Sequence, residues 1–142
     1  MVRKDCVNND HASGGVGLLI SHNFPSSVFP LQTNLQAIAA QLNIHRLITI
    51  CSLYLSPNEN ISQSDLDDLI NQLPPPFILI GDLNGHNPLW GSADINSRGR
   101  QIEKMIDDHA ICILNDGKNT YFHQPTKSFH ALDLAIVSPS IL

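Results

Sequence analysis

A short apolar run, bounded on both sides by residues that interrupt regular structure, constrains the fold more than any other feature of this sequence. Residues 77–80 read FILI and stand between three prolines at 74–76 and Gly81. Four residues are too few for a helix, and an apolar character on both faces is typical of a strand inside a sheet. Three consecutive prolines also exclude a helix across this boundary. The sequence therefore predicts an interior strand over residues 77–80.

Polar side chains follow this predicted strand at every second position. Asp82, Asn84 and His86 alternate with two other residues, so in an extended segment they would face the same side. The end of an interior strand is a common place for an active site in layered α/β proteins. A carboxylate there can deprotonate a water molecule, and an amide can donate to an oxygen on which negative charge develops. The same residues suit a tight turn, so the spacing alone leaves both interpretations open.

Helical periodicity appears twice along the chain. Apolar residues at 66, 69, 70 and 73 follow helical spacing, and Ser62 or Ser64 can cap the start of this helix. A second helix is expected from about residue 96 to residue 110. Its expected inner face consists of Ile102, Met105, Ile106 and Ala110.

Short strands account for most of the remaining apolar runs. Residues 34–42 and 45–55 are expected to pair as an antiparallel hairpin across residues 43 and 44, although the alanines of the first run would also suit a helix. The other expected strands are at 14–20, 111–114, 120–122 and 132–137. The alternation of strands with two helices predicts an α/β protein of the α+β type, with a mixed sheet or sandwich and helices outside.

Length and charge limit the class of protein. The chain has 142 residues, of which 42% are hydrophobic and 15% are charged, and this suits one domain with its own core. The formal net charge of −5 argues against a protein that holds nucleic acid mainly through phosphates. Arg98, Arg100 and Lys104 form one local basic group, which the solvated start of a helix explains more simply.

Cysteine usage and hydropathy predict an intracellular protein. Cys6, Cys51 and Cys112 are sparse and form no C-x-x-C pair, which predicts a reducing compartment without a disulfide framework. No apolar run approaches the roughly 20 residues of a membrane span, and the first residues lack a hydrophobic signal region. His86 and His123 are interpreted as loop residues rather than metal ligands, and no compact zinc-ligand spacing is present.

Five segments of the sequence occur in an order and spacing that match one known family. They are GGVGLLI, SLYLSPN, GDLNGHNPLWGS, NSRGRQIEKMI and the stretch from ILNDG to SPSIL. Together they resemble the endonuclease/exonuclease/phosphatase superfamily, and more narrowly the reverse-transcriptase-associated endonuclease domain of non-LTR retrotransposons. The resemblance covers residues 14–142, within a single partial domain over 1–142. It implies the deoxyribonuclease-like four-layer fold, a two-sheet β-sandwich flanked by helices, here incomplete.

The resemblance implies metal-dependent phosphodiester hydrolysis at the G-D-x-N segment. Asp82 would align or deprotonate the attacking water, and Asn84 would stabilise charge on the phosphate oxygens. Both residues would hold a divalent ion, Mg²⁺ or Mn²⁺. The implied partners are the phosphate backbone of DNA and the reverse-transcriptase domain of a parent polyprotein, with no membrane involved. The implied location is intracellular, and nuclear for the full element.

The resemblance also assigns roles to residues outside that segment. Tyr54 would contact or protonate the scissile phosphate, Asn58 would touch phosphate, and Ser128 would bind substrate. Asp133 would pair with a catalytic histidine and fix its tautomer. Without the resemblance, Tyr54 is explained as a half-buried strand tyrosine and Asp133 as a strand-initial aspartate bound to backbone. His130 stands where the family usually has a serine, so that hydroxyl is lost.

Part of the family's site has no counterpart in this sequence. The family has an Asn and a metal-binding Glu upstream of G-G-V, and an S-D-H segment with the catalytic histidine beyond S-P-x-L. The resemblance therefore implies a domain truncated at both ends, with little or no nicking by this chain alone. It also implies exposed sheet edges and apolar faces, and hence a tendency to aggregate. The alternatives are a catalytically inactive remnant and a phosphoesterase of the same superfamily.

Overall fold

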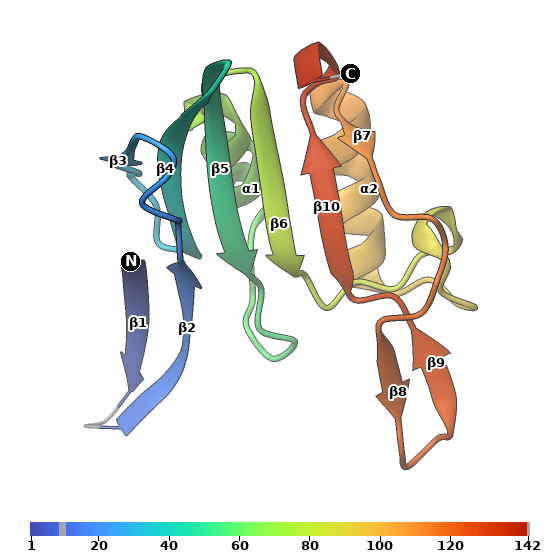
Figure 1. Ribbon diagram of the computed structural model, residues 1–142. Coiled ribbons are helices and arrows are strands. Elements are labelled where there is room, and N and C mark those ends of the chain that lie inside the picture. The colour runs from blue at the N-terminus through green and yellow to red at the C-terminus, as the bar shows by residue number, and fades with distance from the viewer. Residues whose placement is uncertain (9–10, 142) are drawn as a thin grey trace.

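One mixed β-sheet forms the centre of the fold. The computed structural model describes residues 1–8 and 11–141, and the side chains of residues 1–4, 14–128 and 130–141. The main sheet has the strand order β3-β4-β5-β6-β10-β7, in which β5 and β6 are parallel and all other neighbours are antiparallel (Figure 1). Its strands are β3 (Ser26–Phe29), β4 (Gln36–Ile44), β5 (Arg46–Tyr54), β6 (Phe77–Asp82), β7 (Cys112–Ile113) and β10 (Asp133–Val137). The predicted interior strand is confirmed, because β6 lies between β5 and β10.

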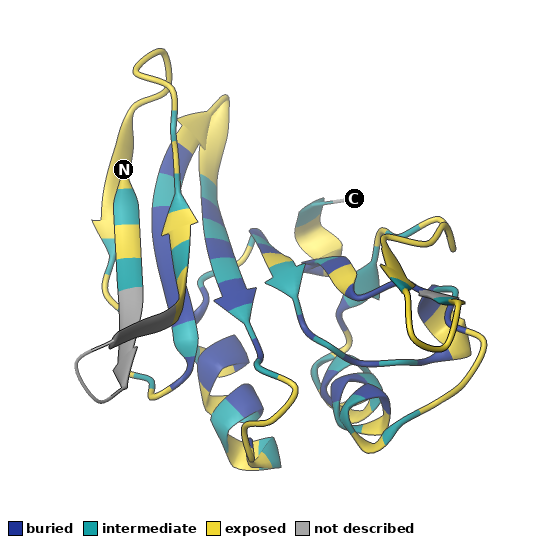
Figure 2. Ribbon diagram, turned by 90° about the horizontal axis from the view of Figure 1, so that it is seen from below, coloured by how far each residue is buried: buried dark blue, intermediate teal, exposed yellow. Residues whose placement is uncertain are grey.

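Both helices lie on the same side of this sheet (Figure 2). Helix α1 (Gln63–Gln72) begins after Ser62, whose hydroxyl accepts a hydrogen bond from the Asp65 N–H while the Asp65 carboxylate accepts one from the Ser62 N–H. This capping box satisfies two N–H groups that the first helical turn leaves unpaired. Helix α2 (Ser97–His109) begins after the cap residue Asn96. The two helices predicted from periodicity are confirmed.

The main hydrophobic core fills the space between the helices and the sheet. Leu66, Leu69, Ile102 and Met105 are fully buried in it. The predicted inner face of α2 is wrong at Ala110, because this residue ends the helix in a left-handed conformation with φ 51° and is exposed. The sheet contributes alternate residues to this core, among them Ala37, Ala39, Cys51, Leu53, Phe77, Leu79, Leu134 and Ile136.

A hairpin covers part of the opposite face of the sheet. Its strands, β1 (Val2–Asn8) and β2 (His11–Leu18), pair antiparallel and contact β4, and β2 also contacts β5. On this face Ile38, Ala40 and Leu42 of β4 are buried. The sequence predicted the second strand of the hairpin as 14–20 and did not predict the first.

Two further features differ from the expected strands. The β4–β5 hairpin is confirmed, so the helical alternative for residues 34–42 is wrong. Its turn is at His45, in a left-handed conformation with φ 62°, rather than at residues 43 and 44. A further hairpin, β8 (Tyr121–His123) with β9 (Ser128–His130), extends beyond the point where β10 begins (Figure 1).

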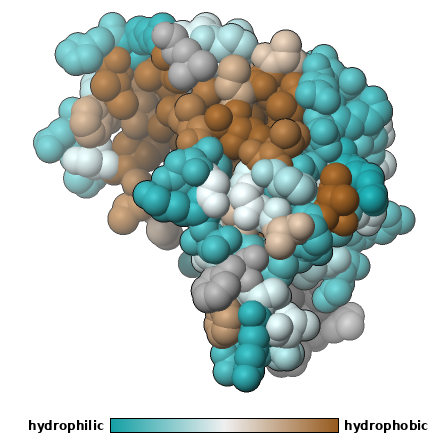
Figure 3. Space-filling model, turned by 90° about the vertical axis from the view of Figure 1, so that its right-hand side faces the viewer, coloured by the Kyte–Doolittle hydropathy of each residue, from teal (hydrophilic) through white to brown (hydrophobic). Residues whose placement is uncertain are grey.

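The expected α/β class is confirmed, with helices outside a mixed sheet. Opposite the helices, hydrophobic side chains remain at the surface on the side of β7 and β10 (Figure 3). Ile80 is 38% exposed and Leu114 is 50% exposed. The expected exposure of apolar sheet surface is therefore confirmed. Neither helix of the described residues has the length and apolar character needed to cross a membrane.

Candidate active site

Three polar side chains lie in one row where β5 and β6 end and β10 begins. Asp82 on β6 is the partner of Asp133 on β10 in the antiparallel ladder. Ser52 on β5 is aligned with Ile80 on β6, so Tyr54, the next residue on that face of β5, lies beside Asp82. All three side chains project from the face opposite the helices.

The position before Asp82, Gly81, requires a glycine for steric reasons. A Cβ atom at Gly81 would overlap the backbone of Leu53, including its carbonyl oxygen, so any other residue would push β6 away from β5. Beyond the strand end, the Leu55 N–H donates to the carbonyl oxygen of Asp82 at 3.0 Å. Gly81 thus keeps Asp82 next to the end of β5.

The chain turns directly after Asp82. Asn84 has a left-handed backbone with φ 50°, and its N–H donates to Asp82 Oδ1 at 3.0 Å, as in the turns that aspartate favours. The Asn84 amide nitrogen donates to the carbonyl oxygen of Leu55 at 2.9 Å. The predicted alternation through His86 is therefore wrong beyond Asp82, because β6 ends there. The turn nevertheless brings Asn84 and His86 to the same pocket as Asp82.

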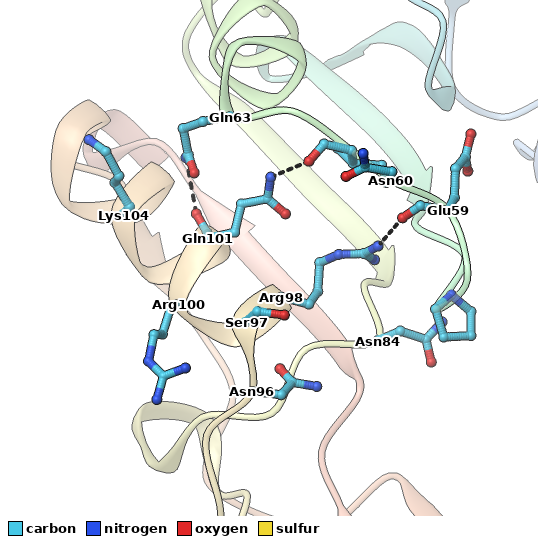
Figure 4. A pocket seen from close by; sticks show the side chains of 12 residues that line it. Glu59, Asn60, Gln63, Asn84, Asn96, Ser97, Arg98, Arg100, Gln101 and Lys104 are labelled. Atoms are coloured by element: carbon cyan, nitrogen blue, oxygen red, sulfur yellow. Dashed lines mark hydrogen bonds between the residues drawn. The ribbon is translucent and has the colours of Figure 1, made fainter.

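Arg98 on α2 holds the loops that carry these residues (Figure 4). Its Nη1 donates to the carbonyl oxygens of Leu55 and Leu83, at 3.3 and 3.2 Å. Its Nη2 donates to those of Ser56 and Glu59, at 2.9 and 3.1 Å. A guanidinium suits this task because its donors form a rigid planar fork. The loops after β5 and β6 are thereby tied to the first turn of α2.

Two pockets meet at this point. The first, which we call the Asp82 pocket, has a volume of about 750 Å³. The second, which we call the Arg100 pocket, has a volume of about 580 Å³ and lies between the loop after β5 and the start of α2 (Figure 4). Pro57 and Asn84 line both pockets. The polar lining of the Asp82 pocket includes Tyr54, Asp82, Asn84, His86, Asp94, His123, Ser128 and His130.

The three basic residues that line the Arg100 pocket make different interactions. The guanidinium of Arg98 donates its hydrogen bonds to backbone carbonyl oxygens. Lys104 forms an ion pair with Asp108 one helical turn away. Arg100 is exposed, and Figure 4 shows its side chain pointing away from Arg98. The predicted basic group is therefore not one continuous patch, and Arg98 has a structural role that charge spacing did not indicate.

The electrostatics of Asp82 suit a bound cation. Burial raises the pKa of Asp82, the Asn84 N–H opposes this shift, and the neighbouring Asp133 carboxylate adds to it. Carboxylates that face each other on adjacent strands repel, and a divalent ion beside them would offset this repulsion. The side-chain oxygens of Asp82 and Asn84 are ligands of the kind that Mg²⁺ accepts. These residues therefore fit a divalent ion.

The other predicted site residues differ in whether they line the Asp82 pocket. Asn58 is exposed in the turn after β5 and lines neither pocket. Ser128 on β9 lines the Asp82 pocket, and its hydroxyl lies 2.9 Å from His130 Nε2. Asp133 begins β10 and is exposed, and its carboxylate adjoins Asp82 across the two strands. Tyr54 is half-buried and lines the Asp82 pocket.

Three residues that the sequence analysis did not group lie together in the Asp82 pocket. His86 Nδ1 is 3.1 Å from Asp94 Oδ1, and His130 Nδ1 is 3.6 Å from the same oxygen. The two imidazole rings are stacked, with centroids 4.0 Å apart and an interplanar angle of 19°. Burial and the neighbouring His86 lower the pKa of His130, and Asp94 opposes the shift. No sequence signal marks this cluster, because its members come from three separate segments.

The chain is a mixed α/β protein, and the family that its sequence matches is of the nuclease and phosphoesterase type. The family described as Endonuclease-reverse transcriptase matches residues 48–142, and the chain belongs to it. The resemblance found from ordered motifs is therefore confirmed.

Individual proteins similar to this chain agree with that family. The RNA-directed DNA polymerase from mobile element jockey of Drosophila funebris is 26% identical over 132 residues, which is 90% of this chain and 14% of that protein. The probable RNA-directed DNA polymerase from transposon BS of Drosophila melanogaster is 24% identical over 133 residues, which is 90% of this chain and 15% of that protein. The chain thus spans a small part of these relatives.

A solved structure supports the fold. The endonuclease domain of TRAS1, a telomere-specific non-LTR retrotransposon, superposes with a TM-score of 0.72 at 23% sequence identity. The match covers 85% of this chain and 57% of that structure.

Proposed function

We propose that this chain is part of a DNA-nicking endonuclease and that its Asp82 pocket cleaves a phosphodiester with the help of a divalent ion. The observation that supports this most directly is the row of Tyr54, Asp82 and Asp133 at one end of the sheet, with Asn84 beside it. These groups supply a base, hydrogen-bond donors and oxygen ligands, which phosphodiester hydrolysis requires.

Each residue would have a distinct task. Asp82 would align the attacking water or accept a proton from it. The Tyr54 hydroxyl would donate to an oxygen of the scissile phosphate. The Arg98 contacts would keep Asn84 and the loop after β5 in place. A divalent ion, when bound at Asp82 and Asn84, polarises the phosphoryl oxygen and offsets its charge.

The composition of the pocket also sets an expectation for the rate. Among the described residues that line the Asp82 pocket, the carboxylates are Asp82 and Asp94, and Asp94 is paired with His86. Mg²⁺ usually keeps several waters and takes one or two protein carboxylates, so Asp82 with the amide oxygen of Asn84 is near the minimum that can hold it, and we expect weak binding. We therefore expect little nicking by this chain alone.

The proposal extends to the partners of the site. Arg100, exposed in the pocket that adjoins Asn84, is the candidate contact for a DNA phosphate. Because the similar proteins are named as RNA-directed DNA polymerases, we propose that a reverse-transcriptase domain accompanies this chain in a longer polyprotein. That polyprotein would work in the nucleus, where its target DNA lies.

A plasmid assay tests the proposed function. The chain, at high concentration, is incubated with supercoiled plasmid in Mg²⁺, in Mn²⁺ or in EDTA, beside the variants Asp82→Ala and Asp107→Ala. Asp107 is an exposed carboxylate on α2 and serves as the matched control. We expect slow nicking that requires the metal, persists in Asp107→Ala and is lost in Asp82→Ala.

Three other results would change these conclusions. If Asp82→Ala nicks DNA as well as the unchanged chain does, the Asp82 pocket is not the active site. Clear multiple-turnover nicking in Mg²⁺ that Asp82→Ala abolishes would keep the site and overturn the expected weak activity. Hydrolysis of an inositol phosphate without cleavage of DNA would assign the chain to the phosphoesterase alternative.

A further inference from the structure

We propose that His86, Asp94 and His130 form a binding site for a divalent transition-metal ion such as Zn²⁺. The three residues lie on the loop after β6, the loop before α2 and strand β9. They line the Asp82 pocket but share no ligand with the ion expected at Asp82 and Asn84. Binding at this site can therefore be measured separately from the proposed nuclease activity.

The ligand atoms of this site are already close together. One ligand atom from each residue lies within 4.8 Å of the other two. His86 Nδ1 is 3.1 and 3.3 Å from the two Asp94 oxygens, and His130 Nδ1 is 3.6 Å from Asp94 Oδ1. Two ligands of a tetrahedral Zn²⁺, each about 2.0–2.2 Å from the ion, are roughly 3.4 Å apart. The observed separations are close to those that one ion would impose.

Because the two histidine rings are stacked, one of them must rotate when a metal ion binds. Rings that are nearly parallel, at an interplanar angle of 19°, cannot both point a lone pair at one ion. His130 is 8% exposed and packed in place, whereas His86 is less buried and lines the open pocket. Binding would therefore turn the His86 ring toward an ion held by His130 and Asp94.

His130 presents a buried nitrogen that has no hydrogen-bond partner. Its Nδ1 atom is inaccessible to solvent and has no hydrogen-bond partner among the described residues. Buried polar atoms without partners are rare, because each carries an uncompensated desolvation cost. A metal ion would satisfy a lone pair on this nitrogen.

A chain of hydroxyl groups orients the other nitrogen of His130. Nε2 lies 2.9 Å from Ser128 Oγ, which lies 2.6 Å from Thr126 Oγ1, which lies 2.7 Å from His123 Nδ1. If His130 Nε2–H donates to Ser128, both hydroxyls can donate onward and His123 Nδ1 accepts. Every group in the chain then has a partner, and the lone pair of His130 is left on Nδ1. Metal-binding histidines are commonly held in this way, through a hydrogen bond from the nitrogen that does not bind the metal.

The ligand types select the kind of ion. Two imidazole nitrogens and one carboxylate favour Zn²⁺ or a similar transition metal, whereas Mg²⁺ prefers oxygen ligands. Three protein ligands are typical of zinc sites that keep a fourth position open. Because this position faces the Asp82 pocket, water or an anionic oxygen such as that of a phosphate would occupy it.

Metal titration of the whole chain tests the site. Zn²⁺ binding is measured by calorimetry in excess Mg²⁺, and Co²⁺ is added separately for its visible absorption spectrum. We expect one Zn²⁺ ion per chain, no competition from Mg²⁺, and a Co²⁺ spectrum of nitrogen and oxygen ligands. Asp94→Asn and His130→Gln should each weaken Zn²⁺ binding by at least about tenfold. His22→Gln, which changes an exposed histidine outside the pocket, should leave binding unchanged.

The variants keep the test decisive even if one of them folds poorly. Asp94 is exposed, so Asp94→Asn removes a ligand without disturbing the core, and circular dichroism verifies the fold of each variant. Equal Zn²⁺ affinity in Asp94→Asn and the unchanged chain would overturn the proposal. A cobalt–thiolate absorption band in the near ultraviolet would do the same, because it would place the ion on a cysteine. No measurable Zn²⁺ binding would overturn the proposal and leave His86 and Asp94 as an ordinary hydrogen-bonded pair.

Discussion

Arg98 joins the two loops of the candidate active site through one guanidinium group. Its donors reach the carbonyl oxygens of Leu55, Ser56 and Glu59 on one loop and of Leu83 on the other. Lysine keeps the charge but cannot place donors on all of these acceptors. Arg98→Lys should therefore lower the free energy of unfolding by about 2 kcal/mol, measured by urea denaturation.

A second arginine on the same helix provides the control for this prediction. Arg100 is exposed, and no hydrogen bond or ion pair of its side chain occurs among the described residues. Arg100→Lys should change the free energy of unfolding by less than about 0.5 kcal/mol. Equal losses in the two variants would show that Arg98 does not hold the loops.

At the scale of elements, the start of α2 is bound to the loop that follows β6. The Asn96 side-chain oxygen accepts the N–H of Gly99 at 2.7 Å, which caps the helix, and the N–H of His86 at 2.9 Å. A Cβ at Gly99 would overlap the carbonyl oxygen of His86, so glycine lets the loop lie directly on the helix. The N-x-R-G segment thus positions both the helix and the loop that carries His86.

Substitution of Asn96 tests how much its two accepted hydrogen bonds contribute to stability. Asn96→Ala removes both acceptor contacts and should lower the free energy of unfolding by about 2 kcal/mol, whereas Asn96→Asp keeps an acceptor and should retain most of the stability. Ser62→Ala at the start of α1 removes a cap that does not hold another loop, and should cost about 1 kcal/mol. Thermal unfolding of the three variants measures the difference. The interpretation fails if Asn96→Asp is as damaging as Asn96→Ala.

The same elements show what the sequence could and could not predict. Helices α1 and α2 and strand β6 were predicted because apolar periodicity and flanking breakers are local signals. Strand β3 reads SSVF and strand β9 reads SFH, and such short runs become strands only through the partners with which they pair. Tyr54 and Asp133 were predicted as separate residues from the family resemblance, and Asp82 was predicted both from its position after the strand and from the resemblance. Their alignment follows from strand register, which no local pattern contains.

Side-chain clusters were the least predictable part of the site. The sequence predicted that Asp82, Asn84 and His86 would alternate along an extended segment. Instead, Asn84 has a left-handed conformation, and its N–H donates to the Asp82 carboxylate. His86 was interpreted as a loop residue, and it does lie in a loop, but the fold stacks it on His130. The roles of the predicted site residues stay predictions until the nicking assay is done.

At the scale of the whole molecule, the two faces of β6 have opposite surroundings. Leu79 points toward the helices and is fully buried, whereas its neighbour Ile80 points away and is 38% exposed. Ile80 and Leu114 line the same surface pocket, and Leu114 is 50% exposed. Exposed apolar sheet surface of this kind promotes association between molecules, so we expect the chain to aggregate through this face.

Two threonine substitutions on this strand test that expectation. Ile80→Thr keeps a β-branched side chain, so it should change the free energy of unfolding by less than about 1 kcal/mol. It should also reduce binding of a hydrophobic dye and raise the protein concentration at which light scattering begins. Leu79→Thr buries a hydroxyl in the core and should cost about 3 kcal/mol or more. If Ile80→Thr leaves dye binding and scattering unchanged, association must occur through another surface, such as the edge of β3, where Val28 is 63% exposed.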